Sequence, residues 1–496
     1  MRTYIQINPA DNVVVAVKDL QTGASLDING RTIVVLQDIP AGHKVALQDF
    51  KEGDHIIKYG APIGHAREVI TTGSWVNEKN IKTNLEGLRE YEFNPQPIPE
   101  QPSRKSLSFN GYRRKNGEVG IRNEIWVIPT VGCVNGITHR LADRLRQETQ
   151  GTGVDAIVAF PHNYGCSQLG DDHENTRKIL RDMVLHPNAG AVLVVGLGCE
   201  NNQVGAFREM LGNYDTERIR FMETQKVDDE LETGMELLRK LYAIASQDKR
   251  TDIPLSELRV GLKCGGSDGF SGITANPLLG VFSDFLVAQG GTTVLTEVPE
   301  MFGAEGFLMD RCIDRDVFVK AEQMINGFKE YFISHNEVVY DNPSPGNKQG
   351  GITTLEDKSC GCVQKGGTAP IMDVIGYGDP VVTKGLNMLY GPGNDLVSAT
   401  AMTAAGAHLI LFSTGRGTPF SAPAPTLKIS TNTPLAEKKA GWIDFNTGVI
   451  ADGEKTIDEA AKDLLDLVIR VASGEQTKAE KHGFREISIF KDGVVL

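Results

Sequence analysis

The sequence predicts a multidomain α/β protein in which a small β-rich module precedes two larger domains built on parallel sheets. Short apolar runs separated by turn signals fill residues 1–92, and four prolines crowd residues 95–102. From residue 110 onward, short apolar strands alternate with helical patterns. Such alternation indicates βαβ units, whose parallel sheets are covered by helices on both faces. The 496 residues are enough for about three domains.

The N-terminal module, residues 1–92, is predicted to consist of short strands. Its apolar runs TIVVLQDIP and KVALQDF are broken by glycine-containing turn signals. Residues 93–108 follow as a linker, because closely spaced prolines favour an extended chain over a helix. This linker marks the first predicted domain boundary.

The rest of the chain is predicted to form a central domain (109–255) and a C-terminal domain (256–496). The predicted strands are 124–129, 155–160, 191–196, 258–263, 292–297, 369–375, 385–390, 407–413 and 426–430. Apolar residues that recur every four positions from Ile137 predict one amphipathic helix. Thr456 and Glu459 have the spacing of a capping box and predict the start of another helix.

Charge and composition exclude several classes of protein. There are 51 Lys and Arg against 64 Asp and Glu, a net charge of −13, so no basic surface for nucleic acid or anionic membrane is expected. No apolar run reaches the roughly 18 residues of a membrane span, and the first residues lack the apolar core of an export signal. Seven cysteines are too few, and odd in number, for a disulfide scaffold. The sequence therefore predicts a cytoplasmic protein without nucleic-acid or membrane partners.

Three of the cysteines recur at a fixed period. Cys133, Cys166 and Cys199 are 33 residues apart, and each follows a glycine just beyond a predicted strand. The carboxyl ends of parallel strands share one edge of a sheet, so we expect these thiols at the edge where α/β sheets bind ligands. Cys264, in KCGGSDGFSG, follows strand 258–263 in the same way. The alternative is that small Gly-Cys pairs merely permit tight packing of strand against helix.

A histidine accompanies these thiols. His162 lies four residues before Cys166 in PHNYGCSQLGDDHEN. Imidazole and thiolate together suit a borderline metal such as Fe²⁺, Mn²⁺ or Zn²⁺. The sequence thus predicts a metal site formed by His162, Cys166, Cys199 and Cys264. The acidic residues that follow can equally be a solvated helix start.

Other chemically capable residues follow strands or lie in glycine-rich loops. Glu297 and Glu300, in TEVPE, follow strand 292–297, and one of them, Glu297 in our assignment, is a candidate general base or metal carboxylate. The alternative is a pair of carboxylates that balances a helix dipole. Arg416, between two glycines, suits a substrate carboxylate because its guanidinium fork makes two charge-assisted bonds. Lys348 lies in the candidate binding loop NPSPGNKQGG. Asn201 and Asp268 are candidate partners of substrate hydroxyls.

Several motifs occur in order across nearly the whole chain: PAGHKVAL, NYGCSQLGDDH, VVGLGCENNQ, CGGSDGFSGITANP, LTEVPEMFGAE, DNPSPGNKQGG, TTLEDKS and FSTGRGTPF. Together they resemble the altronate/galactarate dehydratase family. The resemblance implies an N-terminal SAF (β-clip) module, a central domain through which members form homodimers, and a Rossmann-like parallel sheet in the C-terminal domain. It also implies a need for Fe²⁺ or Mn²⁺ and a reducing medium.

The resemblance further implies a hydro-lyase of hexuronate catabolism. LGDDHENTR and PEMFGAE follow the altronate pattern, so the expected reaction removes water from D-altronate and gives 2-dehydro-3-deoxy-D-gluconate. A base takes the C2 proton, and the C3 hydroxyl leaves with acid assistance. A divalent metal and a cationic side chain are expected to stabilise the charge that develops on the carboxylate oxygens. His43, in PAGHKVAL, is predicted to join Glu297 and Lys348 in catalysis.

Alternatives to this interpretation remain open. Galactarate is the alternative substrate within the same family. An iron–sulfur cluster held by Cys133, Cys166 and Cys199, with one open iron as Lewis acid, is the alternative cofactor. A non-catalytic sensor of sugar acids is the alternative from another functional class. The general base is open among the His, Lys and Glu candidates, and the general acid is open as well.

Overall fold

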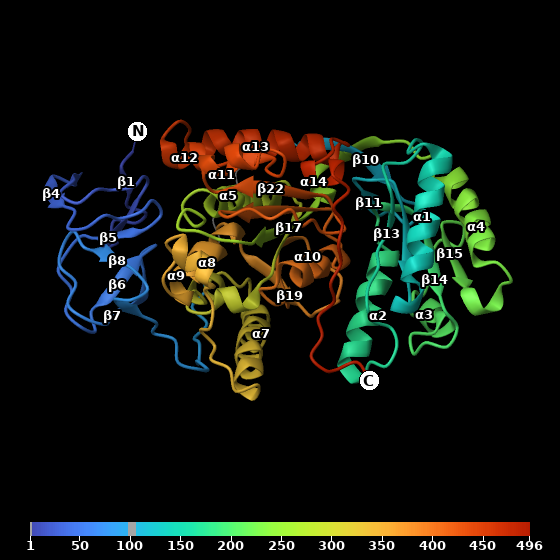
Figure 1. The fold of residues 1–496 in the computed structure, drawn as a ribbon, viewed down its shortest axis with the longest axis horizontal. Helices are drawn as coiled ribbons and strands as arrows, with labels where there is room; N and C mark the ends of the chain where they lie inside the picture. The colour runs from blue at the N-terminus through green and yellow to red at the C-terminus, as the bar shows by residue number, and fades with distance from the viewer. Residues whose placement is uncertain (1, 98–105) are drawn as a thin grey trace.

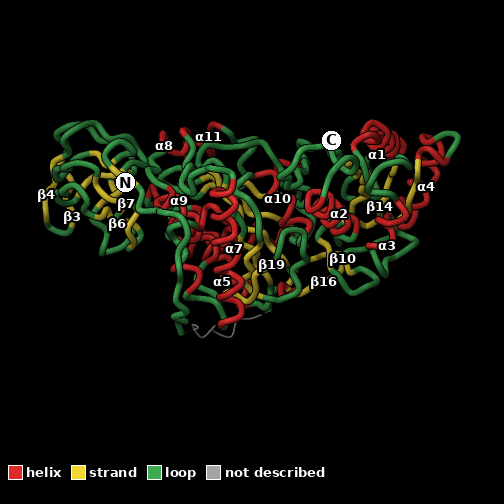
Figure 2. The backbone as a smooth tube through the Cα atoms, turned by 90° about the horizontal axis from the view of Figure 1, so that it is seen from below, coloured by secondary structure: helices red, strands yellow, loops and turns green. Residues whose placement is uncertain are grey.

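The computed structural model describes residues 2–97 and 106–496, and its domains lie in a row (Figure 1; Figure 2). The N-terminal module is at one end, a seven-stranded sheet with its helices is in the middle, and a four-stranded sheet with its helices is at the other end. The predicted linker 93–108 includes residues 98–105, which lie outside the described residues. Among the described residues, no helix combines the length and apolarity needed to cross a bilayer.

The N-terminal module is built of short antiparallel strands, as predicted. The strands are β1 (Tyr4–Ile5), β2 (Val13–Ala16), β3 (Ser25–Ile28), β4 (Arg31–Val34), β5 (Lys44–Ala46), β6 (His55–Lys58), β7 (Ala61–Ala66), β8 (Trp75–Val76) and β9 (Ile81–Lys82). They pair as β1-β2-β5-β8, β3-β4 and β6-β7-β9. Gly42 and Gly53 have φ of 84° and 89° in the turns before β5 and β6, a conformation that glycine adopts without a steric penalty.

The sheet farthest from this module is parallel, in the order β13-β12-β14-β15. Its elements are β12 (Glu124–Pro129), η1 (Gly132–Val134), α1 (Asn135–Thr149), β13 (Ile157–Ala159), α2 (Gly170–Val184), β14 (Ala189–Gly196), α3 (Val204–Met210), β15 (Ile219–Glu223), η2 (Thr224–Lys226) and α4 (Glu230–Ala245). Leu141 and Leu145 of α1 are buried against α4, so the predicted amphipathic helix is confirmed. A small antiparallel sheet, β11-β10-β16, forms where the chain enters and leaves this domain. Its elements are β10 (Ser108–Arg113), β11 (Val119–Gly120), β16 (Thr251–Pro254) and η3 (Leu255–Glu257).

The middle of the molecule is a parallel sheet of seven strands, in the order β19-β20-β18-β17-β21-β22-β23. The strands are β17 (Arg259–Cys264), β18 (Thr292–Leu295), β19 (Ile371–Ile375), β20 (Gly385–Leu389), β21 (Leu409–Thr414), β22 (Thr426–Ser430) and β23 (Phe445–Asn446). The helices are α5 (Ala275–Ala288), η4 (Val298–Met301), α6 (Gly306–Met309), α7 (Arg315–Ser334), α8 (Pro345–Gln349), α9 (Leu355–Cys362), η5 (Val363–Gly366), α10 (Asp395–Ala404), α11 (Thr433–Lys438), α12 (Gly448–Asp452), α13 (Ile457–Ala472) and α14 (Lys478–Lys481). Each predicted strand overlaps an observed one, and the capping box at Thr456 and Glu459 starts α13.

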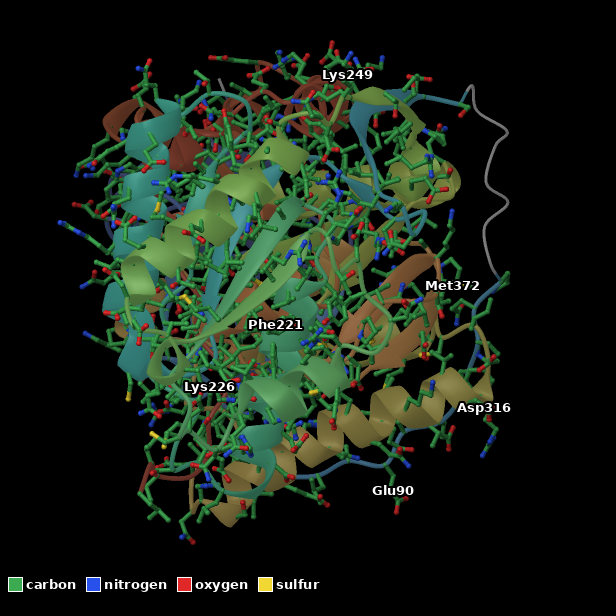
Figure 3. The ribbon with its side chains drawn as sticks, turned by 90° about the vertical axis from the view of Figure 1, so that its right-hand side faces the viewer. Glu90, Phe221, Lys226, Lys249, Asp316 and Met372 are labelled. Atoms are coloured by element: carbon green, nitrogen blue, oxygen red, sulfur yellow. The ribbon has the colours of Figure 1, made fainter. Side chains whose placement is uncertain are left out.

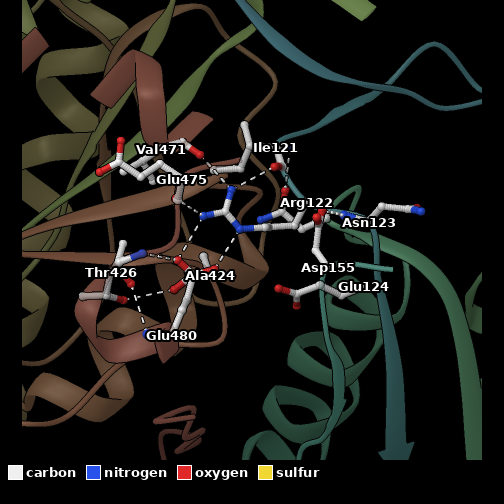
Figure 4. A network of polar contacts seen from close by, with 12 residues as sticks. Ile121, Arg122, Asn123, Glu124, Asp155, Ala424, Thr426, Val471, Glu475 and Glu480 are labelled. Atoms are coloured by element: carbon white, nitrogen blue, oxygen red, sulfur yellow. Dashed lines mark hydrogen bonds and ion pairs between the residues drawn. The ribbon is translucent and has the colours of Figure 1, made fainter. Parts of the chain in front are cut away.

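A buried arginine joins the two parallel-sheet domains (Figure 4). The Arg122 guanidinium donates to Glu480 Oε1 at 2.8 Å and to the carbonyl of Val471 at 2.7 Å. Burial raises the pKa of Glu480, but the charges of Arg122 and Arg485 outweigh burial and lower it to about 2. Loss of Glu480 removes the carboxylate partner of the buried Arg122 guanidinium, so this contact fixes the two sheets relative to each other.

Candidate active site

A cavity of about 790 Å³ opens at the carboxyl edge of the seven-stranded sheet. It lies between the ends of β17 and β20, the helices α8 and α9, and the segment that follows α7. Its polar lining consists of Cys264, Asp341, Asn342, Glu300, Ser344, Asn347, Lys348, Lys358, Asn394 and Asp395. This edge is where open parallel sheets bind ligands, and the volume is in the range of small-molecule sites.

Glu297 lies behind this cavity as a buried carboxyl group, and burial raises its pKa against the opposing effect of Lys263 and Lys365. It is 1% exposed, and its positive φ of 71° turns the chain directly after β18. Lys365 donates to Oε2 at 2.7 Å, Lys263 donates to Oε1, and the backbone N–H of Cys264 also donates to Oε2 at 3.2 Å. Burial lowers the pKa of Lys263, but the surrounding carboxylates outweigh burial and raise it. With its oxygens occupied by cations and an amide, Glu297 is not placed to act as the predicted base.

Glu300 and Lys358, on the cavity wall, and Cys362, in contact with Glu300, form a cluster that sequence spacing did not reveal. Lys358 Nζ is 2.8 Å from Glu300 Oε1 and donates to Asn342 Oδ1 at 3.0 Å. The Cys362 thiol donates to Glu300 Oε2 at 3.0 Å. Burial raises the pKa of Glu300, but Lys358 and neighbouring lysines lower it to about 2. Burial lowers the pKa of Lys358, but Glu300 outweighs it and raises that pKa, so the ammonium stays charged at neutral pH.

Cys264 belongs to this cavity through the end of β17. It is 2% exposed, and its Sγ lies 2.7 Å from Ser267 Oγ. Contact with the Cys362 thiol lowers the pKa of Cys264 well below its ordinary value, and the same contact raises the pKa of Cys362. Cys362 ends α9, so the two thiols join a strand end to a helix end.

The predicted substrate ligands Arg416 and Asp268 and the predicted catalytic residue Lys348 differ in their placement. Arg416 is exposed, and its backbone N–H donates to the carbonyl of the cavity-lining Gly266 at 3.0 Å, so it lies beside the cavity. Lys348 is half-buried and lines the cavity directly. Asp268 is buried and accepts hydrogen bonds from Thr431 and Asn432, at 2.9 and 3.0 Å. Asp268 therefore orders the surrounding loops and presents no free oxygen to a substrate hydroxyl.

The N-terminal module reaches this region through His43. The Trp75 indole donates to His43 Nδ1 at 3.1 Å, and His43 Nε2 lies 3.1 Å from the carbonyl oxygen of Gln349. Burial is the main cause that lowers the pKa of His43, so the ring is neutral at neutral pH. Both ring nitrogens have partners, and the ring does not line the cavity. Neither ring nitrogen of His43 is free to exchange a proton with a substrate in this structure, so the structure does not support its predicted catalytic role.

His162 and Asn201 lie in the other parallel-sheet domain. Figure 3 views that sheet from outside, with Phe221 on β15 and Lys226 beyond the end of that strand. His162 Nε2 donates to the carbonyl of Pro129 at 2.8 Å, and Nδ1 accepts from the backbone of Tyr164 at 3.1 Å. Burial lowers the pKa of His162 to about 4. Asn201 Oδ1 accepts from the backbone of Ser167 at 2.7 Å and does not line the cavity.

The predicted metal ligands are divided between two sheets. His162, Cys166 and Cys199 follow strands of the four-stranded sheet, whereas Cys264 ends β17 of the seven-stranded sheet. Cys166 is half-buried, and Cys199 is exposed with Gln225 Nε2 3.5 Å from its sulfur. Across residues 2–97 and 106–496, no three His, Cys, Asp or Glu side chains are grouped so as to hold a metal ion. The predicted four-ligand set is therefore not assembled here, and we derive no step through a metal.

Comparison with known proteins agrees with this architecture. Family models match residues 2–84 ("Altronate/galactarate dehydratase SAF domain"), 111–246 ("D-galactarate dehydratase/Altronate hydrolase, second domain") and 255–495 ("D-galactarate/Altronate dehydratase, C-terminal"). The chain is 52% identical over 497 residues to the altronate dehydratase of Bacillus subtilis (strain 168), with 100% of both chains covered. It is 53% identical over 496 residues to the altronate dehydratase of Escherichia coli (strain K12), covering 99% of this chain and 100% of that one. Identity to the galactarate dehydratase (L-threo-forming) of the same strain is 33% over 516 residues, covering 99% and 97%. The chain belongs to the altronate/galactarate dehydratase family.

Proposed function

We propose that this protein removes water from D-altronate to give 2-dehydro-3-deoxy-D-gluconate. The observation that carries the proposal is the charged cavity at the carboxyl edge of the seven-stranded sheet, with Lys348 and Lys358 on its wall. The substrate assignment is supported by the 52–53% identity to altronate dehydratases, against 33% to a galactarate dehydratase. Relatives named as enzymes over the full chain also favour catalysis over the sensor alternative.

Lysine side chains on and behind the cavity wall, most of them paired with carboxylates, offer contacts to an anionic substrate. Lys263 and Lys365 hold Glu297 between them behind the wall, and Lys358 pairs with Glu300. Lys348 lines the cavity and makes no ion pair among the described residues, so no carboxylate occupies its side-chain nitrogen. Arg416, beside the cavity, can offer two parallel N–H donors to the substrate carboxylate.

The elimination requires one proton acceptor and one proton donor. We assign the acceptor to Lys348, whose side-chain nitrogen takes the proton from C2 as the electron pair forms the C2–C3 double bond. We assign the donor to Lys358, which protonates the C3 hydroxyl as the C3–O bond breaks, so that the oxygen leaves as water. The resulting enol then ketonises, with loss of the C2 hydroxyl proton and gain of a proton at C3. Fixed cations near the carboxylate stabilise the charge that develops during proton removal.

We propose Fe²⁺ or Mn²⁺ as the cofactor on the basis of family resemblance, and the iron–sulfur cluster, predicted from the spacing of Cys133, Cys166 and Cys199, is the alternative. A divalent ion would supply a Lewis acid for the substrate oxygens. We also propose that the protein acts as a homodimer in the cytoplasm, and light scattering on the purified protein tests the dimer.

The proposed function is tested by 2-keto acid formation from D-altronate and from galactarate. We expect altronate to be preferred in kcat/KM. Lys358→Met is expected to lower kcat by about 10²–10⁴-fold, which is the usual contribution of a general acid. Lys462→Met, at an exposed position on α13, is the matched control and is expected to behave as wild type. A preference for galactarate, or full turnover by Lys358→Met, would contradict the proposal.

A further inference from the structure

The N-terminal module docks beside the cavity through direct contact between backbones. A Cβ atom at Gly269 would lie 2.0 Å from the carbonyl oxygen of Gly42, and one at Gly351 would lie 2.2 Å from the same oxygen. Lys44 Nζ donates to the carbonyl of Gly351 at 2.7 Å. There is no room for side chains at these glycines, so the turn that carries His43 is held at a fixed distance from α8.

Within this contact, His43 donates and accepts hydrogen bonds at the same time. The Trp75 indole N–H can only donate, so Nδ1 must be the acceptor and the ring proton must sit on Nε2. Nε2 therefore donates to the carbonyl of Gln349. The two rings meet edge to face, with centroids 5.0 Å apart at 84°. A neutral histidine of this tautomer satisfies both partners, whereas an imidazolium would oppose the indole donor.

We call the hydrogen bonds from Trp75 through His43 to Gln349 the relay. Gln349 joins this relay to Arg416, the predicted ligand of the substrate carboxylate. It is the last residue of α8, and its backbone carbonyl receives the His43 proton donor. Its side-chain Oε1 accepts from Arg416 Nη2 at 3.3 Å. One residue thus contacts the N-terminal module through its backbone and the guanidinium through its side chain.

We propose that His43 is a positioning residue that sets the place of the Arg416 guanidinium through Gln349. This inference rests on the proposed function, because Arg416 is the group assigned to the substrate carboxylate. His43 transfers no proton in this role and touches no reacting atom. It acts on substrate binding, and its loss is expected to affect KM more than kcat.

The first test is the tautomer of His43 in the wild-type protein. Long-range ¹H–¹⁵N spectra of ¹⁵N-histidine-labelled protein are expected to show a neutral ring with the proton on Nε2, assigned by its absence in His43→Leu. The proton on Nδ1, or an imidazolium at pH 7.5, would overturn the relay. This measurement needs no substrate, so it decides the relay even if altronate is not turned over and the proposed function fails.

The second test is kinetic. His43→Leu is expected to raise KM for altronate about tenfold, the factor that corresponds to one lost hydrogen bond, with a smaller change in kcat. His43→Gln, whose amide can donate to the Gln349 carbonyl, is expected to recover most of the loss. Gln349→Ala is expected to raise KM similarly, and the double variant with His43→Leu is expected to add little, because both act on one contact.

The matched control is His55→Leu, at an exposed position in the same module, which is expected to leave KM unchanged. If the effects of His43→Leu and Gln349→Ala on KM add in the double variant, His43 does not act through Gln349. A loss confined to kcat that His43→Gln does not rescue would assign His43 to proton transfer instead.

Discussion

Asp357 of α9 is the counter-charge for two buried lysines of the N-terminal module. Lys44 Nζ lies 2.8 Å from Oδ2 and Lys58 Nζ lies 2.9 Å from Oδ1, and the three side chains are at most 1% exposed. Asp357→Asn preserves the shape of the side chain but removes the charge. Removal of one partner from a buried ion pair costs about 3–5 kcal/mol. We therefore expect Asp357→Asn to lose about that much of its free energy of unfolding.

The two lysines are expected to respond differently. Burial is the largest influence on Lys44 and lowers its pKa to about 8 even beside Asp357. Without the carboxylate, Lys44 is expected to lose its proton near neutral pH, and so to escape most of the cost of a buried charge. Burial also lowers the pKa of Lys58, but Asp357 outweighs burial and raises it. Lys58 therefore carries most of the penalty in the variant.

Urea unfolding followed by circular dichroism measures this loss. The control is Asp463→Asn, whose ion pair with Lys455 is about half exposed and is expected to leave the midpoint unchanged. The triple variant Lys44→Met, Lys58→Met, Asp357→Leu is expected to regain stability, since apolar replacements of buried ions are often neutral. An Asp357→Asn midpoint equal to that of wild type would refute the reasoning, because it would mean that water reaches the lysines.

Three further outcomes are expected. Chelation should abolish turnover, and Fe²⁺ or Mn²⁺ with a thiol should restore it. Full turnover by metal-free protein would contradict this expectation. A visible absorption band that is bleached by dithionite would indicate an iron–sulfur cluster instead. Arg416→Lys keeps the charge but loses the guanidinium fork, so KM for altronate should rise at least about tenfold. An unchanged KM would show that Arg416 does not bind the substrate carboxylate. Burial lowers the pKa of His186 to about 4, so the unfolded chain binds more protons than the folded protein between pH 4 and its unfolded pKa of about 6.5. The free energy of unfolding should therefore fall by up to about 3 kcal/mol as pH drops through this window, and urea unfolding at pH 7 and pH 5 should show a smaller fall for His186→Gln.

Buried parallel strands were predictable because both of their faces are covered and they read as continuous apolar runs. The strand 409–414 (LILFST) has every residue buried and was readily found. In contrast, β15 (IRFME) was missed because it is an edge strand of mixed polarity, with three of its five residues only half-buried. Hydrophobic pattern is a strong signal in the interior of a sheet and a weak one at its edge.

The candidate site was predictable only where a residue follows a strand or occupies a loop at the right edge. Cys264, Lys348 and Arg416 are at or beside the cavity for that reason. The pairing of Lys358 with Glu300 depends on how α9 packs against η4, which spacing along the chain does not encode. The predicted metal set is not assembled for a different reason: a repeated Gly-Cys context indicates only that a thiol follows a strand, and the predicted boundary at residue 255 already separates Cys264 from the other three ligands.

The charges around the cavity limit which group can move which proton. With a pKa of about 2, Glu300 remains an anion over the neutral range, so it cannot serve as the acid. Lys358 is kept charged by that anion and can donate a proton but not accept one. Proton removal from C2 must therefore fall to a group outside this pair, and Lys348 on α8 is the lysine on the cavity wall that meets this condition. The donor lies on α9, whose Asp357 binds the N-terminal module, and the acceptor lies on α8, whose last carbonyl binds His43. Donor and acceptor are thus held by one module, so a shift of that module is expected to disturb both proton transfers together.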